Sequence, residues 1–143
     1  TPKLVIADEP TPGLDPKLAR RAMEHFRELA DMGAAVLVIT HDLELALQTV
    51  DRIQVFYAGY TIEDSPAEDF AKEETLRHPY TKALWRAMPE HGFHYIDGIQ
   101  PYARDMQQGC PFAPRCQRCT DKCKEEIPWR QSGNGYVRCL YDT

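Results

Sequence analysis

The sequence predicts an α/β fold in which parallel strands are covered by helices, followed by a small, irregular, cysteine-rich C-terminal segment. Two short apolar runs, residues 4–7 (LVIA) and 35–39 (AVLVI), are typical of buried parallel strands. A helical pattern follows each run, which gives the strand–helix–strand–helix order of a parallel sheet. All five cysteines lie after residue 100, where helical and strand periodicity fade.

The composition narrows the classes of protein to consider. A net charge of −5 argues against nucleic-acid binding, and the longest apolar run, residues 34–39, is too short to cross a bilayer. Residues 1–100 carry 10 basic and 17 acidic side chains, whereas residues 101–143 carry 7 and 5, which predicts a boundary near residue 100. No secretory signal is evident, and Thr1 leads at once into a strand pattern. We therefore interpret the chain as a fragment of a cytoplasmic protein.

The first helix is expected to begin at Pro16, with Asp15 as its N-cap, and to end at Gly33. A second helix is predicted over residues 43–50. The first helix should bury one apolar face, formed by Leu18, Ala22, Phe26 and Leu29.

Turn and cap signals organise the middle of the chain. Residues 53–64 are typical of a hairpin that turns at Ala58 and Gly59. Residues 65–68 (SPAE) have the form of a capping box, which predicts a helix start. A further helix should begin after His78, within the run HPYT, and for this motif we expect a structural role rather than contact with substrate.

Two carboxylates come directly after the first apolar strand. Asp8 and Glu9 should lie at the carboxyl end of the sheet, where open parallel sheets bind ligands. One carboxylate can hold Mg²⁺ while the other orients an attacking water; the alternative is a strand that ends in a solvated acidic turn. His41 follows the next strand, so a parallel pair would bring it to the same edge as Glu9. This combination favours the catalytic interpretation.

At this point the sequence resembles the ABC ATPase family, a branch of the P-loop NTPases. The run LVIADEP resembles Walker B, TPGLD resembles the D-loop, and ITHD resembles the switch-histidine loop. The resemblance implies that Asp8 serves Mg²⁺, that Glu9 is the general base and that His41 contacts the γ-phosphate of ATP. It also implies that Asp15 lies at the interface with a second ATPase subunit. Pro12 departs from the small or hydroxyl residue usual in this D-loop.

The sequence has neither a G-x-x-x-x-G-K-[ST] phosphate loop nor an LSGGQ-type signature. We therefore expect only half of an ATPase core, whose missing N-terminal half belongs to the full-length parent, as do ATP and Mg²⁺. The fragment alone should neither bind ATP tightly nor hydrolyse it. Apolar faces that the missing half would cover should be exposed, which favours self-association.

The second half of the chain resembles a narrower group. The runs FYAGYTIEDSP, HPYTKALWRAMP and IDGIQP, together with GCPFAPRC, are similar to the C-terminal region of oligopeptide, dipeptide and nickel importer ATPases. The resemblance implies a second ATPase subunit, identical or different, and membrane permease subunits as partners. It places the protein peripherally on the cytoplasmic side of a bacterial membrane. The expected segments are the ATPase core (residues 1–64), a helical linker (65–100) and the cysteine-rich extension (101–143).

An odd number of cysteines in an apparently cytosolic chain favours a metal or cluster over disulfides. The family pattern corresponds to Cys110, Cys116, Cys123 and Cys139, and four thiolates suit a [4Fe–4S] cluster or Zn²⁺. Cys119 has no counterpart in this family pattern. Together with Cys116 and Cys123 it forms an alternative set of ligands with plausible spacing. Only the resemblance to the importer ATPases favours an iron–sulfur cluster over zinc; the spacing of the cysteines does not decide between them. The alternatives are reduced structural cysteines or adventitious disulfides, and we expect the neighbouring basic residues to lower the thiol pKa values.

Two other functions stay open at this stage. The chain could belong to an ABC ATPase that acts in DNA repair or translation and not in transport. The HPYT run and the cysteines argue against this alternative. It could instead be a stand-alone iron–sulfur, zinc-binding or redox-sensing module in which Asp8, Glu9 and His41 are vestigial.

Overall fold

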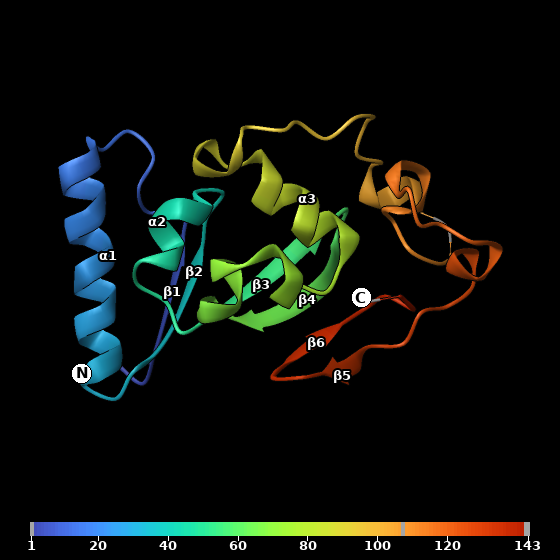
Figure 1. Ribbon diagram of the computed structural model, residues 1–143. Coiled ribbons are helices and arrows are strands. Elements are labelled where there is room, and N and C mark those ends of the chain that lie inside the picture. The colour runs from blue at the N-terminus through green and yellow to red at the C-terminus, as the bar shows by residue number, and fades with distance from the viewer. Residues whose placement is uncertain (1, 107, 142–143) are drawn as a thin grey trace. The chain divides into compact units, whose positions relative to one another are not determined.

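The computed structural model describes residues 2–106 and 108–141 (Figure 1). The chain divides after Val50 into two compact units, which we call unit 1 (Thr1–Val50) and unit 2 (Asp51–Thr143). These units follow contacts along the chain, whereas the segments expected from the sequence follow motifs and end at residues 64 and 100. The segment boundaries stay predictions. Within the described residues, no helix is long and apolar enough to cross a bilayer.

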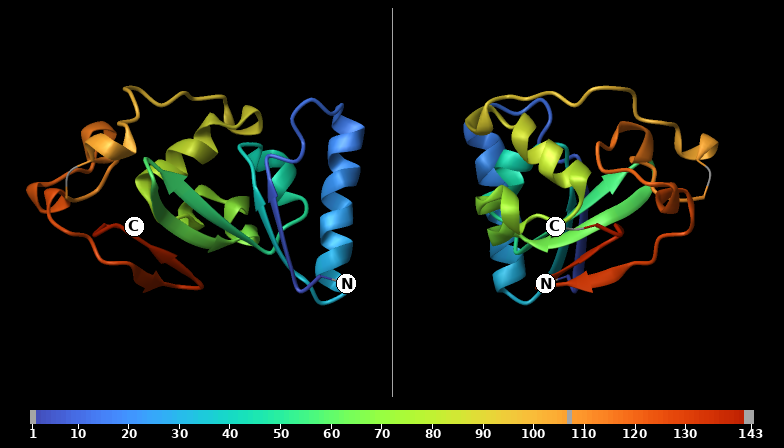
Figure 2. Two further views of the ribbon diagram at one scale, coloured as in Figure 1. Left: turned by 180° about the vertical axis from the view of Figure 1, so that it is seen from behind. Right: turned by 45° about the vertical axis from the view of Figure 1, so that its right-hand side comes forward.

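Unit 1 has the predicted strand–helix–strand–helix order. Its two strands pair in parallel, from Leu4 opposite Ala35 to Asp8 opposite Ile39. The first helix runs along one face of the pair in both Figure 1 and Figure 2. The elements are β1 (Leu4–Asp8), α1 (Pro16–Asp31), β2 (Ala35–Ile39) and α2 (Leu43–Leu47).

Helix α1 begins as predicted but buries a slightly different stripe. Pro16 is its first residue, and Asp15 caps it by accepting hydrogen bonds from the backbone N–H groups of Lys17 and Leu18. Ala19 and Met23 are buried, whereas Leu18, which was predicted to face the core, is 52% exposed. The prediction was wrong for Leu18 alone: Ala22, Phe26 and Leu29 are half-buried, and Ala19 and Met23 are the most buried residues of the inward face.

The second face of the β1–β2 pair is open. The exposed positions alternate along both strands and include Leu4, Ile6, Leu37 and Ile39, which are 43–61% exposed. The continuous apolar runs led us to expect strands buried on both faces. In the described chain only the face beneath α1 is covered, so alternate apolar side chains of each strand stay in contact with solvent.

Unit 2 is built on an antiparallel sheet with the strand order β3-β4-β6-β5. The predicted hairpin between β3 and β4 is present, and its two turn residues, Ala58 and Gly59, both have positive φ (48° and 85°), as a tight two-residue turn requires. The elements are β3 (Arg52–Tyr57), β4 (Tyr60–Pro66), α3 (Pro79–Ala87), β5 (Arg130–Ser132) and β6 (Gly135–Val137). Short 3₁₀ turns connect them: Ala67–Ala71, Glu73–Thr75, Pro89–His91, Ala103–Asp105, Ala113–Arg115 and Asp121–Lys124.

Two predictions for this unit need correction. The C-terminal segment is less irregular than expected, because β5 and β6 form a hairpin that pairs with β4. The capping box at residues 65–68 is absent: the turn that starts at Ala67 has no side-chain cap. The Ser65 hydroxyl donates instead to Glu63 Oε1 at 2.6 Å, because a buried carboxylate is a stronger acceptor for that hydroxyl.

A buried ionic network ties β4 to the start of α3. The Glu63 side chain is 0% exposed and accepts from the backbone N–H groups of Arg77 (2.9 Å) and His78 (2.8 Å). Arg77 lies 2.9 Å from Asp69 Oδ2 and donates to Ser65 Oγ at 2.9 Å. Since both carboxylate oxygens and the guanidinium have partners, the charges are compensated inside the unit. The network fixes the backbone on which His78 sits.

Candidate functional sites

The first candidate site lies at the carboxyl end of the β1–β2 pair. Asp8 is the last residue of β1 and pairs with Ile39, the last residue of β2. The Glu9 N–H donates to the Ile39 carbonyl at 2.8 Å, so the two chains stay together one residue beyond the strands. This register places the residues that follow each strand at one edge of the sheet.

Glu9 and His41 contact each other at this edge. Glu9 Oε1 lies 3.1 Å from His41 Nδ1, within hydrogen-bonding distance. The His41 side chain is 79% exposed and that of Glu9 39% exposed, so a ligand can reach both. Glu9 has φ +47°, a left-handed conformation that is uncommon for a residue other than glycine and that clusters at functional sites. The sequence prediction that parallel strands would bring these residues together is confirmed.

The residues on either side of His41 hold its turn. The Thr40 hydroxyl accepts from the Asp42 N–H at 3.0 Å, and the Asp42 carboxylate accepts from the Leu45 N–H at 2.9 Å as the N-cap of α2. Both flanking side chains are therefore bonded to the backbone. The His41 ring is left as the group that reaches Glu9, while Asp8 is exposed at the end of its strand.

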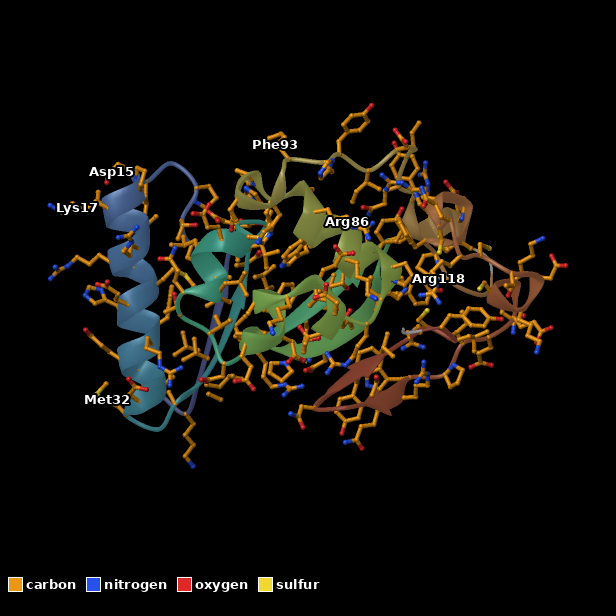
Figure 3. All side chains as sticks on the ribbon, in the orientation of Figure 1. Asp15, Lys17, Met32, Arg86, Phe93 and Arg118 are labelled. Carbon is orange, nitrogen blue, oxygen red and sulfur yellow. The ribbon has the colours of Figure 1, made fainter. Side chains whose placement is uncertain are left out.

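Asp15, the fourth residue predicted for this site, has a local role in the structure. Its carboxylate accepts from Lys17 N at 2.9 Å and Leu18 N at 3.0 Å. Figure 3 shows Asp15 at one end of α1 and Met32 at the other. The loop before it contains a turn in which Leu14 N donates to the Thr11 carbonyl, and Gly13 has φ +83°. Proline followed by a positive-φ glycine suits a type II turn, which accounts for Pro12 in this loop.

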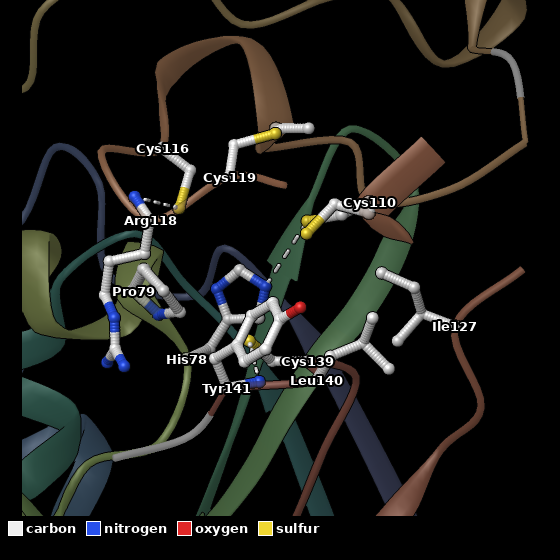
Figure 4. A pocket seen from close by; sticks show the side chains of 12 residues that line it. His78, Pro79, Cys110, Cys116, Arg118, Cys119, Ile127, Cys139, Leu140 and Tyr141 are labelled. Atoms are coloured by element: carbon white, nitrogen blue, oxygen red, sulfur yellow. Dashed lines mark hydrogen bonds between the residues drawn. The ribbon is translucent and has the colours of Figure 1, made fainter. Parts of the chain in front are cut away.

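The second candidate site is a pocket in unit 2 lined by all five cysteines (Figure 4). Cys110 and Cys116 are half-buried, Cys123 and Cys139 are buried, and Cys119 is exposed. The other lining residues are His78, Pro79, Ala113, Arg118, Ile127, Leu140 and Tyr141. The structure therefore brings together, from residues 110–123 and from Cys139, the thiols that the sequence singled out.

Backbone N–H groups point at four of the five sulfur atoms. Cys116 Sγ accepts from Arg118 N at 3.4 Å, Cys123 Sγ from Thr120 N at 3.5 Å and Cys139 Sγ from Tyr141 N at 3.3 Å. Cys110 Sγ receives a hydrogen bond from the backbone of Phe112. Hydrogen bonds to sulfur stabilise thiolates and tune the groups that thiolates bind.

Cys119 differs from these four. Its Sγ lies 3.5 Å from the Thr120 carbonyl oxygen, an acceptor that suits a protonated thiol. Among the described residues, no backbone N–H is directed at its sulfur. The hydrogen-bond pattern therefore separates Cys110, Cys116, Cys123 and Cys139 from Cys119.

A glycine brings the two sides of the pocket together. Gly109 has φ +107°, and a Cβ at this position would lie 2.4 Å from the Cys123 carbonyl oxygen. The next residue, Cys110, donates its N–H to the same carbonyl at 2.8 Å. Only a residue without a side chain permits this approach of Cys110 to Cys123.

Burial raises the pKa of two of the thiols that line the pocket, Cys110 and Cys139. The pKa of Cys110 is raised to about 11, mainly by burial; the hydrogen bond from Phe112 lowers it and the neighbouring thiols raise it by smaller amounts. Burial is also the main cause that raises the pKa of Cys139. We had expected nearby positive charge to lower these pKa values; for Cys110 and Cys139 this was wrong. Arg115, one of the basic residues concerned, bonds instead to the carbonyls of Asp97 and Ile96 and to the Tyr57 hydroxyl.

His78 lines the same pocket, and sequence reasoning missed it as part of this site. Its side chain is 1% exposed, and burial lowers its pKa to about 3, so the imidazole is neutral. The predicted structural role is confirmed: Nδ1 accepts from Tyr80 N at 3.0 Å as the N-cap of α3. The other ring nitrogen, Nε2, lies 3.7 Å from Cys110 Sγ. Neither periodicity nor spacing signals this contact, which joins residues 32 apart.

The two candidate sites differ in the side chains that they could offer to an ion. Among the described residues, no three His, Cys, Asp or Glu side chains surround one point as a single protein-bound ion requires. The sheet edge can still suit Mg²⁺, which takes one or two carboxylates and fills its other positions with water and phosphate oxygens. A structural zinc needs four ligands around one centre. The five thiols line one pocket, but among the described residues no three of them surround a single point.

Comparisons with known proteins address both ends of the chain. The family described as "Oligopeptide/dipeptide transporter, C-terminal region" matches residues 62–123. The chain is 37% identical over 145 residues to the dipeptide transport ATP-binding protein of Haemophilus influenzae, covering 96% of this chain and 43% of that protein. It is 40% identical over 133 residues to the dipeptide transport ATP-binding protein of Escherichia coli, and this match covers 89% of this chain and 40% of that protein. It is 36% identical over 151 residues to the oligopeptide transport ATP-binding protein of Bacillus subtilis, and this match covers 99% of this chain and 45% of that protein. The chain thus spans about two fifths of the length of these curated relatives.

Proposed function

Because the chain resembles the ATP-binding subunits of oligopeptide and dipeptide transporters over almost its whole length, we propose that it belongs to their family and that its sheet-edge residues form part of an ATP-hydrolysing centre in the whole protein. The observation that carries the proposal is the 3.1 Å contact between Glu9 Oε1 and His41 Nδ1 at the carboxyl end of a parallel strand pair. Parallel sheets bind ligands at this edge. Unit 1 would then be part of a P-loop NTPase core of the ABC type.

Each residue at the edge has a proposed task. Glu9 accepts a proton from the water that attacks the γ-phosphate, and His41, held beside it, contacts that phosphate. Asp8 holds Mg²⁺, directly or through water. Asp15 uses its carboxylate to hold the start of α1, and its loop would meet the second ATPase subunit.

The test is ATP hydrolysis by the whole protein. Glu9→Gln keeps the size of the side chain but removes the base, so kcat should fall by about 10²–10⁴-fold while ATP binding is retained. Glu24→Gln, an exposed position on α1, is the matched control and should leave kcat unchanged. An unchanged kcat in Glu9→Gln would contradict the proposal.

We propose further that the 143 residues alone do not turn over ATP. Their sequence contains no glycine-rich phosphate loop, so the backbone amides and lysine that normally hold a triphosphate are not supplied. Turnover by the pure chain, lost in Glu9→Gln, would overturn this part of the proposal.

For the whole protein we propose peptides rather than nickel as the cargo. The relatives are named as dipeptide and oligopeptide transport proteins, which favours peptide import over a role in repair or translation. The partners would be a second ATPase subunit and membrane permease subunits, on the cytoplasmic face of the membrane. Isolation of the whole protein without any permease, under conditions that preserve transporters, would argue against this assignment.

We propose that the pocket in unit 2 is a four-thiolate site for a [4Fe–4S] cluster, formed by Cys110, Cys116, Cys123 and Cys139. The support is the set of backbone N–H groups that reach these four sulfurs. Cys119 lies outside the set, and residues 101–143 would be a cysteine-rich extension of the core. A brown sample with absorbance near ~400 nm is the expected result. Stoichiometric zinc in the purified sample would overturn the cluster assignment.

A redox-sensing role is the second candidate function. It would be supported if oxidation of the cluster changes ATP turnover.

A further inference from the structure

His78 has two side-chain nitrogens with different partners. Nδ1 accepts the Tyr80 N–H at 3.0 Å, and Nε2 faces Cys110 Sγ at 3.7 Å, as Figure 4 shows. The His78 N–H donates to Glu63 Oε2 at 2.8 Å. The ring is therefore held between its own helix and the thiol pocket, while a buried carboxylate holds the backbone of the same residue.

The helix cap decides where the imidazole proton lies. A backbone N–H can only donate, so Nδ1 must present its lone pair to Tyr80. A neutral imidazole carries its one N–H on the other nitrogen, which here is Nε2. The Nε2–H group is thus directed at the Cys110 sulfur, and Nε2 has no free lone pair with which to bind a metal.

The cap alone does not explain a histidine at this position. Asparagine, aspartate, serine and threonine are the usual N-cap residues, and each can accept the Tyr80 N–H. Their side chains are too short to place a second polar atom where Nε2 lies. What imidazole adds is a rigid donor on the far side of the ring, in contact with Cys110.

Resting on the thiolate site proposed above, we propose that His78 is a positioning residue that donates Nε2–H to the Cys110 thiolate and thereby raises the reduction potential of the iron–sulfur group. Reduction adds one electron, and part of the added negative charge lies on the sulfurs. A donor held against one sulfur stabilises the reduced form more than the oxidised form. Without that donor, reduction becomes less favourable.

The first test compares His78→Asn with the unaltered full chain after anaerobic reconstitution with iron and sulfide. Asparagine can retain the cap but cannot reach Cys110, so iron and sulfide content should stay unchanged. In a titration with dithionite followed by electron paramagnetic resonance, the ratio of reduced to oxidised chain at a fixed potential should fall by about tenfold, which is about 59 mV for one electron. His94→Asn, at an exposed histidine of the same unit, is the matched control and should not change the ratio.

Three outcomes overturn the inference in distinguishable ways. An unchanged ratio in His78→Asn, with the cluster bound, contradicts the role of His78 alone. An equal shift in His94→Asn shows that the effect is not specific to the pocket. Failure of the unaltered chain to take up iron and sulfide contradicts the proposed thiolate site itself, and the inference with it.

A second measurement needs no variant to fold. In the reduced, unaltered chain labelled with ¹⁵N-histidine, electron–nuclear double resonance should detect a weak ¹⁵N coupling and an exchangeable proton near the cluster. A strong ¹⁵N coupling, typical of direct ligation, would overturn the hydrogen-bond assignment, and so would the absence of any histidine coupling.

Discussion

Units 1 and 2 place their candidate functional residues by different means. In unit 1, strand register alone brings Glu9 and His41 to one edge, where His41 is largely exposed and Glu9 is partly exposed. In unit 2, residues from three segments converge on a pocket, and the histidine among them is held by a buried ion-pair network. A site made by strand register needs little beyond two strands, whereas a site made by convergence depends on the packing around it. Substitutions away from the chemistry should therefore harm unit 2 far more than unit 1.

The largest effect is expected from Glu63→Ala. This change removes the acceptor of two backbone N–H groups and leaves Arg77 with one carboxylate partner instead of two. Loss of one partner from a buried network costs about 3–5 kcal/mol of the free energy of unfolding. Both tryptophans, Trp85 and Trp129, lie in unit 2, so urea unfolding followed by tryptophan fluorescence measures this unit. Glu68→Gln, at an exposed site of the same unit, should cost less than ~0.5 kcal/mol, and equal losses in the two variants would show that the buried network does not stabilise unit 2 as described.

Acid should weaken unit 2 through His78. Burial lowers the folded-state pKa of His78 from 6.5 to about 3, so between these values only the unfolded chain binds the proton. Stability present above pH 6.5 is therefore lost as the pH falls toward 3, by roughly 3 kcal/mol between pH 7 and pH 4. In the same fluorescence assay, His78→Asn should lose less stability over this interval, while His94→Asn should behave like the unaltered chain. The same pH dependence in all three proteins would show that His78 is not the group responsible.

In unit 1, the corresponding change is Asp15→Ala. It removes the cap that holds the start of α1 and should cost about 1 kcal/mol, measured by far-ultraviolet circular dichroism during urea unfolding. Asp15→Asn keeps a capping oxygen and should restore most of this loss. If Asp15→Ala is neutral, the carboxylate is free for another role, and the local account of Asp15 is wrong.

The smallest effect on stability is expected on the open face of the β1–β2 pair. Ile6→Thr and Leu37→Thr replace side chains that are 61% and 48% exposed, so each should change the free energy of unfolding by less than ~0.5 kcal/mol. Both should nevertheless reduce concentration-dependent self-association of the chain, measured by sedimentation velocity, because they break an exposed apolar patch. Leu18→Thr, at an equally exposed site on α1, is the control. An unaltered chain that stays monomeric at all concentrations would contradict this expectation.

The sequence-based predictions succeeded where local rules suffice. The contact between Glu9 and His41 followed from two apolar runs and the geometry of parallel strands, and the Asp15 cap, the Ala58–Gly59 turn and the His78 helix start followed from short-range signals. On α1 the prediction failed only for Leu18, because sequence alone does not show which apolar side chains a partner element covers.

The parts that could not be predicted depend on contacts between distant residues. Ser65 was expected to cap a helix, but the buried carboxylate of Glu63 takes its hydroxyl. The role of His78 beside Cys110 depends on the same carboxylate, which fixes the backbone of the histidine. The β5–β6 hairpin carried only a weak signal, a Gly133–Asn134 turn between strands of three residues, and it forms by pairing with β4.

The central claim about unit 2 is that four thiols form a site and the fifth does not. The most direct measurement is the iron, sulfide and zinc content of the anaerobically purified chain and of its single cysteine-to-serine variants. We expect about four iron and four sulfide per chain in the unaltered protein and in Cys119→Ser, and loss of both from Cys116→Ser. Loss of iron from Cys119→Ser with retention in Cys110→Ser, or zinc in place of iron throughout, would contradict it.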